Sequence, residues 1–125
     1  MSSFKNSVGR VISAGASARL RPGDEVFVPG ANCYGEIKGL FGGAASRIVV
    51  PEHRTVALPA GLGETGILFA LGATAHHAVA GKNAILPELI IGHGILGRLI
   101  ARITIALGAE APTVWERNPM RQDGD

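Results

Sequence analysis

The sequence contains a single cysteine, Cys33, among its 125 residues. One thiol forms neither a disulfide framework nor a C-x-x-C metal motif, and such scarcity is compatible with a reducing compartment. We therefore predict a cytoplasmic protein.

The chain also lacks a long uninterrupted apolar run. Its most apolar region, residues 67–79, is broken by Gly72, Thr74 and two histidines, and it falls short of the roughly 18 apolar residues of a membrane span. The first five residues do not have the charged-then-apolar layout of a secretory signal. We therefore expect no transmembrane segment and no secretory signal.

Charge of one sign is not concentrated in this sequence. Twelve Lys and Arg against ten Asp and Glu give a formal net charge of +2. The basic residues are scattered, without the clustered face that a nucleic-acid backbone requires, so we expect no nucleic-acid partner. At 46% hydrophobic and 18% charged residues, the chain is apolar enough to form a core.

The most informative stretch is an apolar run at 89–91 followed by G-x-G-x-x-G at 92–97. The run predicts a short buried strand, and apolar residues at 96, 99, 100, 103 and 107 predict a helix that ends at Gly108. In a dinucleotide site the first glycine allows a tight turn, the second lets the backbone approach a pyrophosphate, and the third lets helix and strand pack closely. The helix N-terminus offers unpaired N–H groups to the phosphates.

A second predicted strand, Thr113–Trp115, ends in Glu116, about 20 residues beyond the last motif glycine, where an acidic residue holds the ribose hydroxyls. A carboxylate there favours NAD over NADP because it repels a 2′-phosphate, although Arg117 beside it opposes that preference. The alternative is an ordinary βαβ unit with a glycine-rich turn. The predicted cofactor-binding residues are Gly92, His93, Gly94, Ile95, Leu96, Gly97 and Glu116.

The first half of the chain has short apolar stretches separated by proline and glycine turns. This pattern predicts a small, mainly antiparallel β unit, with a turn at Arg21–Asp24 and an irregular glycine-rich segment at 31–44. The predicted strands cover residues 8–14, 25–28, 46–50 and 55–58.

The hydrophobic period then changes to that of a helix over 64–80, with Glu64 in its first turn and Gly81 just past its end. The helix is apolar nearly all round, so we expect it to be buried between layers. Residues 82–88 are predicted to form a linker, and the polar tail 118–125 is expected to be loose. The predicted fold class is α/β.

A complete dinucleotide-binding fold needs two βαβαβ halves, whereas this sequence predicts one βαβ unit with large apolar faces exposed. We expect the chain to be a piece of a longer enzyme. The alternative is a shortened relative that completes its sheet as a homo-oligomer.

With these parts in order, the chain resembles the medium-chain dehydrogenase/reductase superfamily. The resemblance implies a partial GroES-like β domain at 1–63, a connecting helix and linker at 64–88, and the first βαβ unit of an NAD-binding Rossmann domain at 89–125. It is carried by Val8–Val11, Gly23–Val26, Thr74–Ala78 and the glycine motif. Longer runs are similar to its bacteriochlorophyllide dehydrogenase branch; they are residues 26–34, 39–47, 73–77, 92–98 and 112–116.

The resemblance implies an NAD-dependent oxidation of the 3-(1-hydroxyethyl) group of a bacteriochlorophyllide to 3-acetyl, in bacteriochlorophyll a biosynthesis. Within the same class, the alternative is another zinc-independent alcohol or quinone oxidoreductase. From a different class, the alternative is an inactive fragment or assembly module.

The sequence departs from the zinc-dependent members of this superfamily. Phe4–Ser7 stands where they have Gly-His-Glu, and Cys33 stands alone where they often have four cysteines. Because a catalytic zinc site needs three protein ligands, we expect no metal site.

The candidate catalytic residues are His76, His77 and Thr74, on the helix that leads to the cofactor cleft in the family. One imidazole is expected to accept the proton of the alcohol, since histidine titrates near neutral pH. The two rings point about 100° apart, and the alternative is that both are packed, hydrogen-bonded histidines.

Five further residues are candidates for contact with cofactor or substrate, and each also has an alternative interpretation in which its side chain makes no such contact. His93 is expected beside the pyrophosphate, where either its imidazolium or its backbone N–H assists binding. Arg98 either reaches a phosphate or is simply solvated. Cys33, Tyr34 and Phe41 either line the pocket of a flat macrocycle or pack as ordinary apolar side chains.

Overall fold

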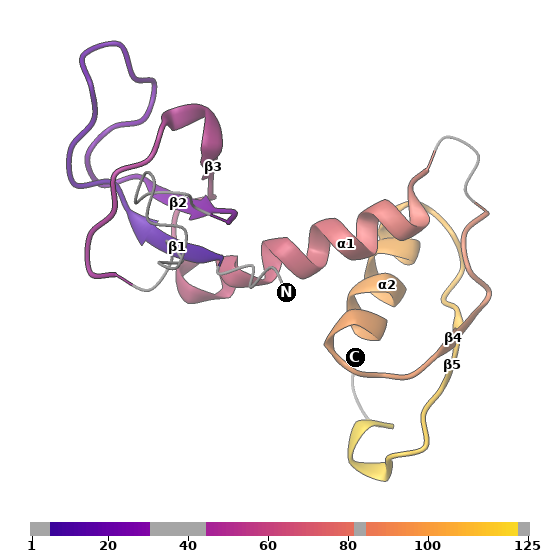
Figure 1. The fold of residues 1–125 in the computed structure, drawn as a ribbon. Helices are drawn as coiled ribbons and strands as arrows, with labels where there is room; N and C mark the ends of the chain where they lie inside the picture. The colour runs from indigo at the N-terminus through magenta and orange to yellow at the C-terminus, as the bar shows by residue number, and fades with distance from the viewer. Residues whose placement is uncertain (1–5, 31–44, 82–84, 123–125) are drawn as a thin grey trace. The chain divides into compact units, whose positions relative to one another are not determined.

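The first part of the chain forms a three-stranded antiparallel sheet (Figure 1). The computed structural model describes residues 6–30, 45–81 and 85–122. In the sheet, β1 (Ser7–Arg10) pairs with β2 (Glu25–Val28), whose other edge pairs with β3 (Val56–Ala57). The predicted antiparallel unit is confirmed. The predicted irregular segment 31–44, with Cys33, Tyr34 and Phe41, lies outside the described residues.

The sheet is closed by the predicted turn and covered by a small apolar cluster. The backbone N–H of Arg21 donates to Oδ2 of Asp24 at 2.7 Å, and the N–H of Asp24 donates back to the carbonyl of Arg21 at 3.1 Å, which confirms the turn. The cluster centres on buried side chains of β2, with partly buried side chains from three other segments packed on it. Its members are Val26 and Val28, with Val11, Leu20, Ile48 and Val50 around them.

Two strand predictions in this unit are wrong in extent or kind. Strand β1 stops at Arg10 instead of continuing to 14. Val11 still exchanges backbone hydrogen bonds with Asp24 and Gly23, where the turn at Arg21–Asp24 ends the pairing. Residues 46–50 form no strand in the described structure. Both edges of β2 are already paired, so this segment contributes only side chains to the apolar cluster.

The predicted helix 64–80 is a 3-10 helix, η2 (Gly63–Leu68), followed by an α-helix, α1 (Phe69–Val79). Glycines at 63 and 66 weaken regular α-helix at its start. The expectation that this helix is buried all round is wrong, because Ala75 and Val79 are the buried residues among the eleven of α1. The rings of Phe69 and Phe27 lie 6.0 Å apart between centroids.

The second part of the chain is a βαβ unit. Strand β4 (Leu89–Ile91) pairs in parallel with β5 (Thr113–Trp115), and α2 (Ile95–Ala106) connects them. The chain divides into two units, Met1–Phe69 and Ala70–Asp125, and the βαβ unit falls in the second. The strand, glycine turn, helix and second strand predicted from the sequence are confirmed.

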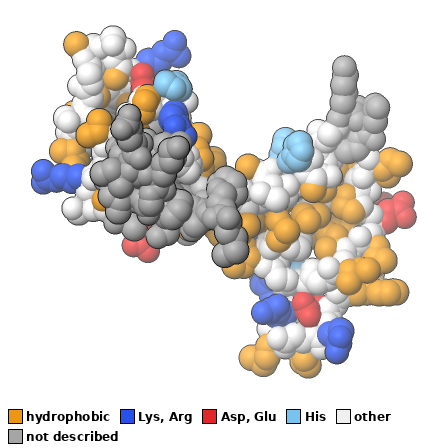
Figure 2. Space-filling model, viewed as in Figure 1, with side chains coloured by type: hydrophobic (Ala, Val, Ile, Leu, Met, Phe, Trp, Pro, Cys, Tyr) orange, Lys and Arg blue, Asp and Glu red, His pale blue; other side chains and the backbone are white. Residues whose placement is uncertain are grey.

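One face of the β4–β5 sheet carries exposed apolar side chains. Ile90 is 7% exposed and its Cγ2 lies toward Gly97 of α2. Alternation along the strand turns its neighbours the other way, and Ile91 and Trp115 are 80% and 63% exposed. The predicted exposed apolar face is therefore confirmed, and Figure 2 shows hydrophobic side chains spread over the surface of this unit.

Within the described ranges, no helix combines the length and the apolar character that crossing a membrane requires.

Candidate functional site

The glycine turn begins directly after β4. Gly92 has a φ of 101°, in the left-handed region that favours glycine. Its N–H donates to the carbonyl of Trp115 at 2.7 Å, so the turn continues the parallel strand pairing by one residue. The chain thus leaves the sheet beside the end of β5.

The last motif glycine is required by close packing. A Cβ on Gly97 would lie 2.1 Å from the carbonyl oxygen of Gly92 and 3.1 Å from its carbonyl carbon. Both atoms belong to the backbone, so neither can rotate away. The first turn of α2 therefore packs directly on the glycine turn, as the motif predicts.

The first amides of α2 lie before the first hydrogen bond of the helix. The first hydrogen bond of the helix runs from the N–H of Arg98 to the carbonyl of Gly94 at 3.0 Å. The N–H groups of Ile95, Leu96 and Gly97 precede it and therefore have no partner within the helix. Together with the helix dipole they favour an anion at this end.

Glu116 lies against the same loop. Its Oε2 accepts the backbone N–H of His93 at 2.7 Å, and its Oε1 accepts the N–H of Asn118 at 2.8 Å. The N–H groups of Asn118 and His93 hold the pKa of the Glu116 carboxyl below its ordinary value, and the charge of Arg121 adds to this. The structure therefore brings Glu116, a predicted cofactor-binding residue, to the glycine turn.

The His93 side chain is buried between the glycine turn and the segment that follows β5. The residue is 8% exposed, and its Nδ1 lies 2.6 Å from the carbonyl oxygen of Arg121. Its backbone N–H is bonded to Glu116, and its carbonyl accepts Nε of Arg98 at 3.3 Å. The imidazole thus faces the segment after β5, and a role at a pyrophosphate stays a prediction for both His93 and Arg98.

The C-terminal segment is ordered over residues 118–122, so the expectation of a loose tail is wrong there. The 3-10 helix η3 (Pro119–Arg121) is capped by Asn118, whose Oδ1 accepts the N–H of Met120 at 3.0 Å. Nε2 of Gln122 donates to the carbonyl of Glu116 at 2.9 Å. An Asn-Pro pair is a known helix-start signal, and it was the sequence feature that could have revealed this turn.

The candidate catalytic residues lie on α1. Thr74, His76 and His77 are exposed, and Oγ1 of Thr74 donates to the carbonyl of Ala70 one helical turn earlier at 3.0 Å. The interpretation of the two histidines as packed side chains is therefore wrong. In the described part of the chain, no hydrogen bond or ion pair joins these three side chains to the glycine turn, and their catalytic role stays a prediction.

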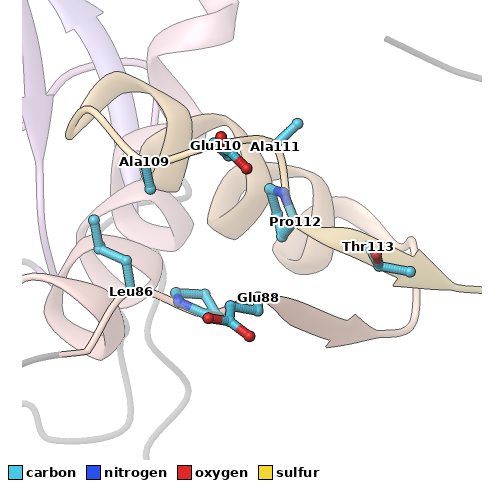
Figure 3. A pocket seen from close by; sticks show the side chains of 8 residues that line it. Leu86, Glu88, Ala109, Glu110, Ala111, Pro112 and Thr113 are labelled. Atoms are coloured by element: carbon cyan, nitrogen blue, oxygen red, sulfur yellow. The ribbon is translucent and has the colours of Figure 1, made fainter.

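A cavity of about 450 Å³ lies at the opposite end of the β4–β5 sheet (Figure 3). It is bordered by the residues that precede the two strands, with Glu88 and Glu110 as its acidic groups. The glycine turn follows the carboxyl ends of the strands, so this cavity is separate from the turn. The lining residues are Leu86, Pro87, Glu88, Ala109, Glu110, Ala111, Pro112 and Thr113.

No three His, Cys, Asp or Glu side chains of the described ranges gather as metal ligands. The expectation of no metal site stays a prediction.

The fold and site together define a βαβ unit with a glycine-rich turn and an acidic residue after its second strand. Two curated proteins are similar to the chain over nearly all of it. The 2-desacetyl-2-hydroxyethyl bacteriochlorophyllide A dehydrogenase of Rhodobacter capsulatus is 52% identical over 119 residues, 94% of this chain. The protein of the same name from Cereibacter sphaeroides is 52% identical over 121 residues, 93% of this chain.

The chain spans 38% of the length of each of these relatives. No protein-family model matches it, and no solved structure gives a significant match. These two relatives confirm the resemblance to bacteriochlorophyllide dehydrogenases that the sequence indicates.

Proposed function

We propose that this chain contributes the cofactor-binding start of a dehydrogenase that oxidises the 3-(1-hydroxyethyl) group of a bacteriochlorophyllide to 3-acetyl, with NAD as the cofactor, in bacteriochlorophyll biosynthesis. The observation that carries the proposal is the 52% identity over 94% of the chain. In this assignment residues 1–63 belong to a GroES-like β domain, and residues 89–125 open a Rossmann domain.

The glycine turn supports NAD as the cofactor. A Cβ on Gly94 would meet no described atom nearer than Nη1 of Arg121 at 3.9 Å, so the space beside the backbone is open at this glycine. The amides of Ile95 and Leu96, which have no partner within α2, would donate to the pyrophosphate. The Glu116 carboxylate would accept the two ribose hydroxyls, and its charge would disfavour a 2′-phosphate.

The reaction requires a hydride acceptor and a proton acceptor. NAD, held by the glycine turn, the first amides of α2 and Glu116, would supply the acceptor for the hydride of the carbinol carbon. The hydroxyl proton must be removed as the C=O bond forms, and Thr74, His76 and His77 are the candidates for this step. Both imidazoles are exposed in the described part of this chain.

Titration of the chain with NADH tests the cofactor assignment. Trp115 is the one tryptophan of the sequence and precedes Glu116, so energy transfer from its indole to the dihydronicotinamide reports binding at this site. We expect saturable transfer that Gly94→Glu abolishes, because the new carboxylate would repel the pyrophosphate. Ala111→Glu is the matched control, since it places the same charge on an exposed residue at the opposite end of β5.

Equal binding by wild type and Gly94→Glu would contradict the assignment of the glycine turn. Saturable binding without any oxidation of a hydroxyethyl chlorin, in a chain extended to the length of its relatives, would favour another alcohol or quinone as the substrate.

A further inference from the structure

His93 makes two connections between the glycine turn and the segment that follows β5. Its backbone N–H donates to Oε2 of Glu116 at 2.7 Å, and its Nδ1 lies 2.6 Å from the carbonyl oxygen of Arg121. A carbonyl oxygen only accepts hydrogen bonds, so Nδ1 must carry a proton. The residue is 8% exposed, which protects this bond from competition with water.

The bond to Arg121 fixes the turn that orients Glu116. The N–H of Arg121 donates to the carbonyl of Asn118 at 2.9 Å, and the N–H of Asn118 donates to Oε1 of Glu116 at 2.8 Å. Restraining Arg121 therefore restrains Asn118, and Asn118 restrains one oxygen of the carboxylate. The backbone N–H of His93 restrains the other oxygen.

The restrained carboxylate retains the capacity to bind a diol. An ionised carboxylate has about four acceptor positions, and the two backbone amides occupy one on each oxygen. The backbone N–H of Arg117 also acts on this carboxylate, and the acceptor capacity that remains would serve the hydroxyl donors of a diol. The same turn brings Nη1 of Arg121 to 3.9 Å from the Cβ position of Gly94.

We propose that His93 is a positioning residue: its imidazole holds the 118–122 turn on the glycine turn and thereby orients the Glu116 carboxylate toward the free 2′,3′-diol of an adenine nucleotide. The inference rests on the proposed function for the ligand class, and on the two hydrogen bonds of His93 for the role.

Nucleotide selectivity separates positioning from a merely structural role. Loss of folded protein weakens NADH and NADPH equally, whereas displacement of Glu116 weakens the nucleotide with a free 2′-hydroxyl more. The side chain introduced by His93→Leu has no hydrogen-bond donor. We expect this substitution to lower the preference of the chain for NADH over NADPH by about tenfold, which is the effect of losing one charge-assisted hydrogen bond between the Glu116 carboxylate and a ribose hydroxyl. His93→Asn restores an N–H near the Nδ1 position and should retain the preference within about twofold.

A double-mutant cycle assigns the effect to Glu116. In a Glu116→Gln background, His93→Leu should leave the remaining NADH to NADPH ratio unchanged, because both substitutions act through one carboxylate. An unchanged preference in His93→Leu alone, or an equal further loss in the double variant, would overturn the positioning role.

The protonation of His93 provides a measurement independent of any nucleotide. Nitrogen NMR of the imidazole, assigned by its absence in His93→Asn, should show a protonated Nδ1. An imidazole protonated at Nε2 alone would overturn the inference and leave the proposed function intact. A wild-type chain that binds neither nucleotide would overturn both.

Discussion

Substitution of Gly97 by alanine tests the contact on which the glycine turn depends. The added Cβ would lie 2.1 Å from the carbonyl oxygen of Gly92, about 1.3 Å short of the 3.4 Å at which ordinary van der Waals contact begins. The helix must therefore move away from the turn and from Ile90, whose Cγ2 is 3.7 Å from the same position. The buried contact between α2 and β4 is lost as a result.

The magnitude follows from two opposing effects. Alanine is better than glycine inside a helix by about 1 kcal/mol, while overpacking against an unyielding neighbour costs up to about 3 kcal/mol and occasionally more. Because the neighbour here is backbone, the cost is at the upper end, and we expect a net loss of about 2 kcal/mol in the free energy of unfolding. That loss is a large part of the stability of a small domain.

Gly94→Ala is the matched control. Gly94 has a φ of −74°, which any residue adopts, and its nearest described atom is the flexible guanidinium of Arg121 at 3.9 Å. Urea unfolding of both variants, followed by circular dichroism and by the fluorescence of Trp115, measures the difference. Stabilities within about 0.5 kcal/mol of each other would refute the close-packing argument for Gly97.

Three further predictions concern the same unit. Thr104 is fully buried and its Oγ1 has no hydrogen-bond partner among the described residues. Thr104→Val should therefore raise the free energy of unfolding by about 1 kcal/mol. Thr104→Ser, which keeps the hydroxyl, should not raise it. The pKa of Glu116 is lowered from its ordinary value of 4.5, so its contribution to stability is present above that value and is lost as the pH falls through the lower pKa of the folded state. Glu116→Gln should therefore reduce the loss of stability that wild type shows as the pH is lowered. An unchanged loss would show that another group causes it. Asn118→Ala removes the acceptor for the N–H of Met120 and should destabilise the turn by about 1 kcal/mol. The measurement is amide hydrogen exchange at Met120, which should become faster. An unchanged exchange rate would show that the cap is dispensable.

Local chemistry explains why the second unit could be predicted from the sequence. Strand β4, the glycine turn and α2 follow one another directly. The first motif glycine, Gly92, has a conformational requirement and the last, Gly97, a packing requirement, and neighbouring residues impose both. The position of Glu116 beside the turn also depends on short-range order, because parallel pairing of β4 with β5 fixes where the second strand ends.

The wrong predictions concern segments whose structure depends on contacts between residues far apart in the sequence. Residues 46–50 have the composition of a strand, but their pairing depends on whether an edge of β2 is free. The 118–122 segment is polar, and its order comes from hydrogen bonds to His93 and Glu116. The buried position of His93 follows from that same turn, so neither could be derived without the other.

The most direct test of the central claim couples the cofactor to the substrate. This chain, continued by the remaining sequence of the Rhodobacter capsulatus relative, would be incubated with NAD⁺ and a 3-(1-hydroxyethyl) bacteriochlorophyllide. The proposed function predicts one 3-acetyl product for each NADH formed, with both lost in Gly94→Glu. Formation of the 3-acetyl product without NADH, or NADH binding with no change in the pigment, would contradict it.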